Sequence, residues 1–179
     1  MSTAYLTHAP TSTNSQKGCS YDIRVLNTLQ LYGLCFYPKA TATYNIQFFF
    51  RSGTAVGREL SSSGWSQVVS TSRSLTANAV SCYTITSRWL YPGATYGVFM
   101  FANSGGNVDY VNYASVGTVM ASNTWLQLKA NKGHAGKFTG ALYSPRGCKT
   151  RVYYNAPTKR PTKRPTKYPT KYPTKYPTK

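Results

Sequence analysis

The sequence predicts an all-β fold: an antiparallel β-sandwich, jelly-roll-like, with a disordered or extended, polyproline-II-like C-terminal tail. Three observations carry this prediction. The chain is dense in Tyr, Phe, Val and Thr from Cys19 to Ala156, Gly, Asn and Ser interrupt it at short intervals, and no segment shows a helical period. We therefore expect a flexible N-terminal arm over 1–18, a β-sandwich domain over 19–156 and a basic repeat tail over 157–179.

Alternation of apolar and polar residues places the strands within the predicted domain. The clearest segment is Tyr44-Asn45-Ile46-Gln47-Phe48, which alternates before the apolar pair Phe49 and Phe50. The other segments are shorter or less regular, and their ends are set by the nearest turn residues. The predicted strands cover 23–34, 44–50, 66–71, 81–89, 96–101, 124–129, 137–143 and 150–154.

The charge of the chain is strongly one-sided. Twenty-one Lys and Arg stand against only Asp22, Glu59 and Asp109, which gives a formal net charge of +18 over 179 residues. Such a surface repels itself and favours a polyanion, an anionic glycan or an acidic protein as partner. The alternative is that the charge only keeps the protein in solution.

The shortage of acids argues against catalysis. Glycoside cleavage usually needs two carboxylates, and only Glu59 and Asp109 lie well inside the predicted core region. A Ser/His/Asp triad would have to use His8 or His134, and neither lies near a G-x-S-x-G motif. We therefore expect a protein that is not an enzyme, with no catalytic residue and no cofactor.

The four cysteines and the N-terminal residues indicate in which cellular compartment the protein is made and whether its thiols are oxidised. Cys19, Cys35, Cys82 and Cys148 are widely spaced, without a C-x-x-C pair, so no metal site is expected. They form one or two disulfides or remain buried thiols, and the sequence leaves these alternatives open. The residues after Met1 lack the pattern of a signal peptide, and no apolar run is long enough to span a membrane, which predicts synthesis in the cytosol.

The tail is the most specific feature of the sequence. From Pro157 it repeats P-T-K-R twice and P-T-K-Y three times before a final P-T-K. Proline at every fourth position fixes φ and removes backbone donors, so an extended chain reaching roughly 70 Å is expected. Spaced cations and rings suit nucleic-acid phosphates, an acidic polysaccharide or an acidic groove on a protein lattice, the alternative being an inert linker. The predicted binding residues are Lys159, Arg160, Lys163, Arg164, Lys167, Tyr168, Lys171, Tyr172, Lys175, Tyr176 and Lys179.

Three tryptophans are candidates for a second kind of site. Flat aromatic faces stack on sugar rings, so Trp65, Trp89 and Trp125 are predicted to contact a sugar if they are exposed. The alternative is that they belong to the core of the sandwich. The sequence does not decide between exposure and burial.

The segment from Ser81 to Tyr154 resembles a jelly-roll carbohydrate-binding module. The resemblance rests on the strand 83–90, the turn Pro92-Gly93, the strand 96–101 and the segments 121–128 and 140–154. It implies sugar binding by the core. Such modules often end on a strand containing Asp, whereas this chain has Arg151-Val152-Tyr153-Tyr154-Asn155, so no calcium or sugar ligand is carried over.

The whole chain is similar in style to small virion proteins of the large icosahedral DNA viruses of algae, the chlorovirus type. The shared features are the leaderless start, the scarcity of acids, the compact β core and a tail similar to the Pro-Ala-Pro-Lys repeats of such viruses. This resemblance implies a minor capsid protein, made in the host cytoplasm and present in the virion, with its tail threaded between neighbours.

These observations lead to one expectation and two alternatives. We expect a non-enzymatic structural protein whose tail laces it to other capsid or matrix proteins, or to nucleic acid or acidic polysaccharide. The first alternative is a carbohydrate-binding or adhesive protein of an extracellular matrix or cell wall, since Tyr-Pro-Thr-Lys repetition is similar to mussel foot adhesives. The second is a nucleic-acid-packaging protein.

Overall fold

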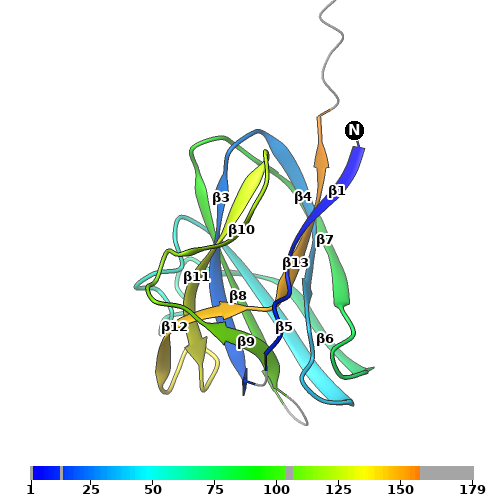
Figure 1. Cartoon of the computed structure of the whole chain (residues 1–179), viewed down its shortest axis with the longest axis vertical. Helices are drawn as coiled ribbons and strands as arrows, with labels where there is room; N and C mark the ends of the chain where they lie inside the picture. The colour runs from blue at the N-terminus through cyan, green and yellow to red at the C-terminus, as the bar shows by residue number, and fades with distance from the viewer. Residues whose placement is uncertain (1, 13, 104–106, 158–179) are drawn as a thin grey trace, which may run out of the picture.

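The computed structural model describes residues 2–12, 14–103 and 107–157. These residues form two antiparallel sheets that pack face to face, with no helix in the described chain (Figure 1). The predicted all-β sandwich is therefore confirmed. Since there is no helix, none in the described ranges is long and apolar enough to cross a membrane.

The smaller sheet has four strands and the larger has nine. The smaller runs β1 (Ser2–His8), β13 (Thr150–Ala156), β4 (Leu29–Phe36) and β7 (Ser81–Leu90). The larger runs β2 (Ser15–Gln16), β9 (Val108–Asn112), β12 (Leu142–Cys148), β11 (Leu126–His134), β3 (Gly18–Val25), β8 (Thr95–Asn103), β5 (Ala42–Ser52) and β6 (Ser66–Leu75), and β10 (Val119–Ser122) pairs with β11.

The strand order is that of a jelly roll with an insertion. Strands β3-β8-β5-β6 of the larger sheet face β1-β13-β4-β7 of the smaller, and the chain passes back and forth between the two sheets. The four strands from β9 to β12 are inserted between β8 and β13, and they extend the larger sheet beyond β3. The N-terminal end of β1 and the C-terminal end of β13 are paired, Ser2 opposite Ala156, so both ends of the domain lie together (Figure 1).

The main core lies between the sheets and follows the strand period of two. In β5, Tyr44, Ile46 and Phe48 are fully buried, whereas Asn45 is exposed and Gln47 is half-buried. A second apolar cluster lies on the outer face of the larger sheet. There Phe49, Phe99 and Phe101 are covered by Trp65 and Phe138, which belong to the β5–β6 and β11–β12 loops.

Both pairs of cysteines form disulfides. Cys19 of β3 is bonded to Cys148 of β12, on the two sides of β11, and Cys35 of β4 is bonded to Cys82 of the adjacent β7. No described cysteine is free. The alternatives that the sequence left open are thus resolved in favour of two disulfides.

The structure corrects three local predictions. The expected strand over 23–34 is two strands, because the amides of Leu26 and Asn27 both donate to the carbonyl of Trp125 instead of continuing a ladder. The expected strand over 137–143 is mostly a loop, since Phe138 and Gly140 have positive φ values of 54° and 77°. The N-terminal arm expected to be flexible contains β1, which pairs along its whole length with β13.

Candidate polyanion-binding surface

All three acidic side chains of the protein are buried. Asp109 is completely buried, and its two carboxylate oxygens lie 2.7 Å from Nζ of Lys149 and 3.2 Å from Nζ of Lys39. Glu59 is 3% exposed, with Oε1 lying 3.4 Å from Nζ of Lys132. These buried carboxylates are paired with lysines of the same protein and offer no negative charge to a partner.

The third acid, Asp22, is held by hydrogen bonds rather than by an ion pair. The backbone N–H of Ala55 donates to its Oδ1 at 2.7 Å and the hydroxyl of Thr54 donates to its Oδ2. Burial raises the pKa of this carboxyl, and the two hydrogen bonds lower it in part. Asp22 therefore fixes the start of the β5–β6 loop and is also withdrawn from the surface.

Several arginines are held by aromatic rings in place of carboxylates. The guanidinium of Arg51 lies 5.4 Å from the ring of Trp65, and that of Arg88 lies 5.3 Å from the ring of Phe50. Within the described ranges, the only ion pairs are the three made by Lys39, Lys132 and Lys149. A ring orients a guanidinium without cancelling its charge, so these arginines keep a full positive charge near the surface.

The outer face of the smaller sheet carries a row of tyrosines. Tyr5 of β1 lies directly opposite Tyr153 of β13, with ring centroids 5.6 Å apart, and Tyr32 of β4 lies 6.0 Å from Tyr153 on the other side. Tyr5 is 55% exposed. The ring of Tyr153 lies over Gly33, where an added Cβ would come within 3.1 Å of the Tyr153 Cβ. The glycine thus leaves space for the ring to lie across the sheet.

Arg151 places a fixed cation within this row. Its Nε donates to Thr7 Oγ1 at 2.8 Å, its Nη1 donates to the hydroxyl of Tyr153 at 3.1 Å, and its guanidinium lies 4.6 Å from the Tyr5 ring. The hydrogen bond with Tyr153 is the main cause that raises the pKa of Arg151, and burial opposes it. We call Tyr5, Tyr32, Tyr153 and Arg151 the tyrosine–arginine face.

Of the three predicted tryptophans, Trp89 has the most accessible side chain. It is 44% exposed and lies opposite Gln30 of β4. Gln30 lies opposite Asn155 of β13 on its other side, so Trp89 is on the same face of the sheet as the tyrosines. Trp65 is partly buried in the second cluster and donates from Nε1 to the carbonyl of Arg58 at 3.1 Å. Trp125 is partly buried against the main core. These two are therefore held in packing contacts.

The tyrosine–arginine face was not predicted from the sequence. The signal was present in part, because Val152 and Tyr154 alternate with Arg151 and Tyr153, so the latter two share the opposite face of β13. The eleven predicted tail residues, from Lys159 to Lys179, lie outside the described residues. The last described residue, Pro157, directly follows β13, which is one of the strands that carry this face.

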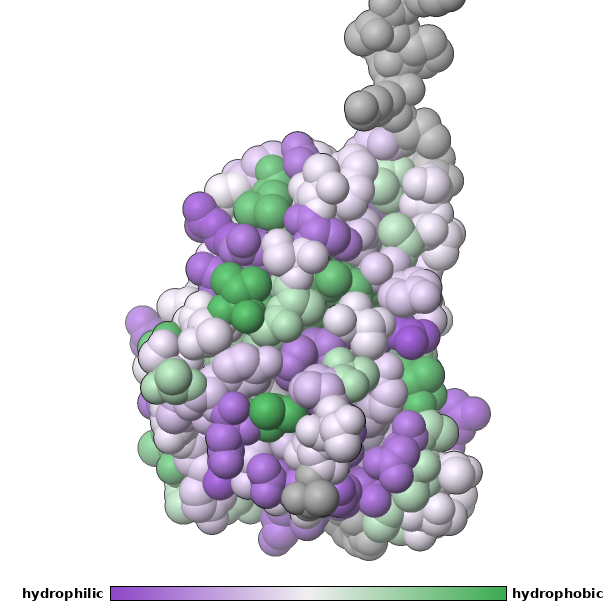
Figure 2. All heavy atoms as spheres, in the orientation of Figure 1, coloured by the Kyte–Doolittle hydropathy of each residue, from purple (hydrophilic) through white to green (hydrophobic). Residues whose placement is uncertain are grey.

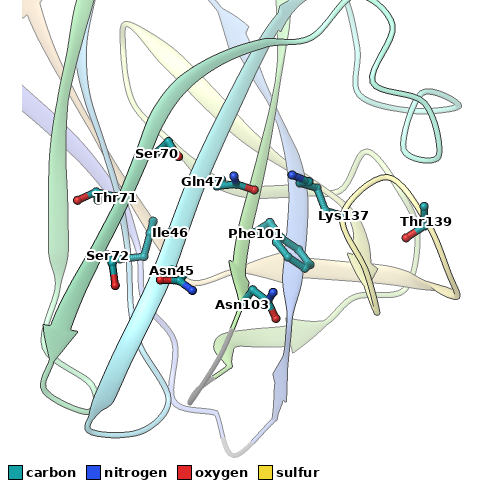
Figure 3. A pocket seen from close by; sticks show the side chains of 10 residues that line it. All are labelled: Asn45, Ile46, Gln47, Ser70, Thr71, Ser72, Phe101, Asn103, Lys137 and Thr139. Carbon is teal, nitrogen blue, oxygen red and sulfur yellow. The ribbon is translucent and has the colours of Figure 1, made fainter.

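A polar groove lies on the other sheet, across β5, β6 and β8 (Figure 3). It has a volume of about 630 Å³, and its walls include Asn45 and Gln47 of β5, Ser70 of β6, and Lys137 from the β11–β12 loop, with Phe101 on its floor. Amide and hydroxyl groups beside a ring are suited to a sugar as well as to an anion.

The space-filling view shows residues of intermediate hydropathy over most of one side of the domain, with hydrophilic and apolar residues in separate patches (Figure 2). No single continuous apolar area covers that side. Its surface thus favours polar or charged contacts over the burial of a large apolar interface.

One pair of residues has the geometry of a nucleophile and base. Nε2 of His134 lies 2.9 Å from Oγ of Ser20, and Asn131 donates to the same oxygen at 3.0 Å. Burial lowers the pKa of His134 to about 4, so the ring is neutral near neutral pH. Both side chains are fully buried. Ser20 Oγ also donates to the carbonyl of Lys132 at 3.3 Å, so these side chains form a hydrogen-bonded group between β3 and β11.

The described residues hold no group of three His, Cys, Asp or Glu side chains placed to bind a metal ion. No protein-family model matches this chain, and a search of curated proteins finds no match.

Proposed function

We propose that this chain is a non-enzymatic structural protein that binds an anionic polymer through its basic tail and the tyrosine–arginine face. The observation that supports this proposal most strongly is that all three acids are buried, and two of them are paired with lysines of the same protein. The arginines that contact aromatic rings have no carboxylate to balance their charge. The outward charge is therefore positive without local neutralisation. Arginine beside exposed tyrosine supplies a cation and a stacking surface to a phosphate or sulfate polymer.

The burial of the acids also bears on the kind of partner. A lattice made only of this chain would bring cationic surfaces together without exposed carboxylates to pair with them. The tail is thus better matched to a different, acidic partner, such as another capsid or matrix protein, nucleic acid or acidic polysaccharide. The two disulfides favour a working location where thiols stay oxidised, which includes virion surfaces and the extracellular space.

We place this role in a virion, as a minor capsid component, on the strength of the resemblance in tail and composition. The test is mass spectrometry of virus particles purified from the cells in which this chain is made. Recovery of the chain from the particles in stoichiometric amounts supports the proposal. Recovery of the chain only from cell wall or matrix fractions would assign it to the adhesive alternative.

The binding role is tested by measuring affinity for heparin and for a duplex DNA of 20 base pairs between 50 and 200 mM NaCl. A variant of this chain for comparison replaces the eight tail cations with Gln and leaves the domain unchanged. The full chain is expected to lose about 10³-fold in affinity over this range, and the variant is expected to bind more weakly with a shallower salt dependence. Binding that salt and the variant leave unchanged would contradict the proposal.

A second candidate function, carbohydrate binding, is favoured by the polar groove of Figure 3 and by exposed Trp89. A neutral polysaccharide bound there would be retained at high salt, because no charge contributes to it. Asn45→Ala and Trp89→Ala, tested separately on a panel of neutral polysaccharides, would then reveal which surface holds the sugar.

A further inference from the structure

A separate cavity lies at the edge of the larger sheet, where β2, β9 and β12 meet the end of β11. It has a volume of about 390 Å³. Two cations, Lys17 and Arg146, and two tyrosines, Tyr110 and Tyr143, contribute to its walls. We call it the β2–β12 cavity; the described residues that line it include none of the tyrosine–arginine face.

Gln16 gives this cavity a buried donor without a partner. The Oε1 atom of Gln16 accepts a hydrogen bond from Nη1 of Arg146 at 2.6 Å. The side chain is 5% exposed, and among the described residues its Nε2 atom has no hydrogen-bond partner. A buried N–H group that is left unpaired costs free energy, so its presence in a cavity wall points to a ligand that accepts a hydrogen bond.

The backbone is shaped to hold this pair. A Cβ at Gly133 would lie 1.7 Å from Gln16 Oε1 and 2.7 Å from Arg146 Cδ. Only a residue without a side chain leaves room for both groups against β11. The Gln16–Arg146 pair is therefore a built feature of the fold and not a chance contact of two long side chains.

Arg146 is also fixed on its two flanks. Its guanidinium lies 4.1 Å from the ring of Tyr110 and 4.3 Å from the ring of Tyr143. Tyr110 is buried, whereas Tyr143 is 39% exposed. Arg146 forms no ion pair within the described ranges, because Asp109 is paired with Lys39 and Lys149 and Glu59, whose charge acts on His134, is paired with Lys132. The cation in the cavity is thus oriented, partly desolvated and not neutralised.

We propose that the β2–β12 cavity binds a tetrahedral oxyanion, the sulfate or phosphate group of a small ester. Gln16 Nε2 donates one hydrogen bond, the free N–H groups of Arg146 donate others, and Lys17 adds a second positive charge at the opening. The exposed Tyr143 supplies a face on which the ring of the esterified sugar or nucleoside can stack. His134, also in the wall, is neutral and adds no charge.

The test uses the full chain and isothermal titration with sodium sulfate at constant ionic strength. Wild type is expected to bind one sulfate saturably. Gln16→Glu places a carboxylate beside Arg146 in nearly the same volume, so the fold is kept while sulfate affinity falls at least tenfold. Arg146→Gln is expected to cause a similar loss, and the matched control Arg73→Gln, an exposed arginine of β6, stays within twofold of wild type.

The outcomes separate this site from the proposed polymer binding. Gln16→Glu is expected to leave the salt dependence of heparin binding within error, since the tail is untouched. Glucose 6-sulfate and adenosine 5′-monophosphate, titrated next, identify the source of the ester by which of them binds more tightly than the free ion. The proposal is overturned if sulfate does not saturate, if Gln16→Glu binds it like wild type, or if the Arg146 and Arg73 variants lose affinity equally. Binding of the free ion with neither ester would overturn the assignment to an ester.

Discussion

Asp109 and Lys149 form an ion pair inside the protein, with Nζ 2.7 Å from Oδ2 and the carboxylate fully buried. The two residues also share a backbone hydrogen bond, from the amide of Lys149 to the carbonyl of Asp109 at 3.0 Å. The pair thus ties β9 to the junction between β12 and β13. It connects the inserted strands to the strand that ends at the tail.

Replacing Asp109 with Asn should destabilise the domain strongly. The change leaves Lys149 buried without a countercharge, which costs about 3–5 kcal/mol of unfolding free energy when one partner of a buried pair is removed. Urea unfolding followed by tryptophan fluorescence measures the difference. Arg73→Gln, which removes an exposed charge, is the control and should change stability by less than about 0.5 kcal/mol. Equal stability of Asp109→Asn and wild type would mean that the pair is solvated in solution.

Stability should fall as the pH falls from 6.5 to 4, because of His134. Burial lowers its pKa from 6.5 to about 4, so the folded state resists a proton that the unfolded chain accepts. The contribution is fully present above pH 6.5 and is lost progressively down to pH 4, by roughly 3 kcal/mol. Burial also lowers the pKa of His8, which acts in the same direction. Urea midpoints at pH 7.5 and 4.5 measure the loss.

His134→Gln separates this effect from the other titrating groups. Gln keeps a polar atom near Ser20 but does not titrate, so the loss between pH 7.5 and 4.5 should be smaller than in wild type. Asp22 acts with the opposite sign. Its raised pKa adds stability that is present in acid and is lost as the pH rises through the folded-state pKa. An identical loss in His134→Gln and wild type would assign the acid sensitivity elsewhere.

The two disulfides should contribute unequally. The bond between Cys19 and Cys148 closes a separation of 129 residues, and that between Cys35 and Cys82 closes 47. The chain-entropy relation gives about 5 and about 4 kcal/mol for loops of these lengths. The double variant Cys19→Ser/Cys148→Ser should therefore have a lower urea midpoint than the double variant Cys35→Ser/Cys82→Ser. The reverse order would show that the unfolded chain is already constrained around the first bond.

The sequence predicts the central strands well and the edges poorly. In β5 buried and exposed residues alternate from Ala42 to Phe48, because one side of the strand faces the main core. Strand β8 is an apolar run that is buried on both sides, between the main core and the second cluster. Ser2–His8 alternates weakly and is polar for most of its length, so its local pattern resembles a loop. It becomes a strand through pairing with β13, about 150 residues away in the sequence, which no local pattern encodes.

The candidate sites could be predicted only in part. The tail is visible from its repeat, and the outward positions of Arg151 and Tyr153 follow from alternation in β13. The neighbours Tyr5 and Tyr32 depend on the register of β13 with β1 and with β4, and a bulge between Tyr153 and Tyr154 shifts the register with β4. The Gln16–Arg146 pair joins residues 130 positions apart, and its dependence on Gly133 is visible only when backbone and side chains are placed together.

Arg151→Lys should weaken polymer binding while keeping its salt dependence. Lysine keeps the charge, but it loses the planar contact with the Tyr5 ring and the two directed hydrogen bonds to Thr7 and Tyr153. These contacts hold the guanidinium in place before the polymer binds, and we expect their loss to lower heparin affinity about two- to fivefold, which corresponds to about 0.5–1 kcal/mol. Arg151→Gln should lose the charge as well and lower the slope of log K against log salt by about 1. Arg73→Lys and Arg73→Gln are the matched controls. If they change binding as much as the Arg151 variants do, then net charge alone governs affinity and the tyrosine–arginine face has no special role.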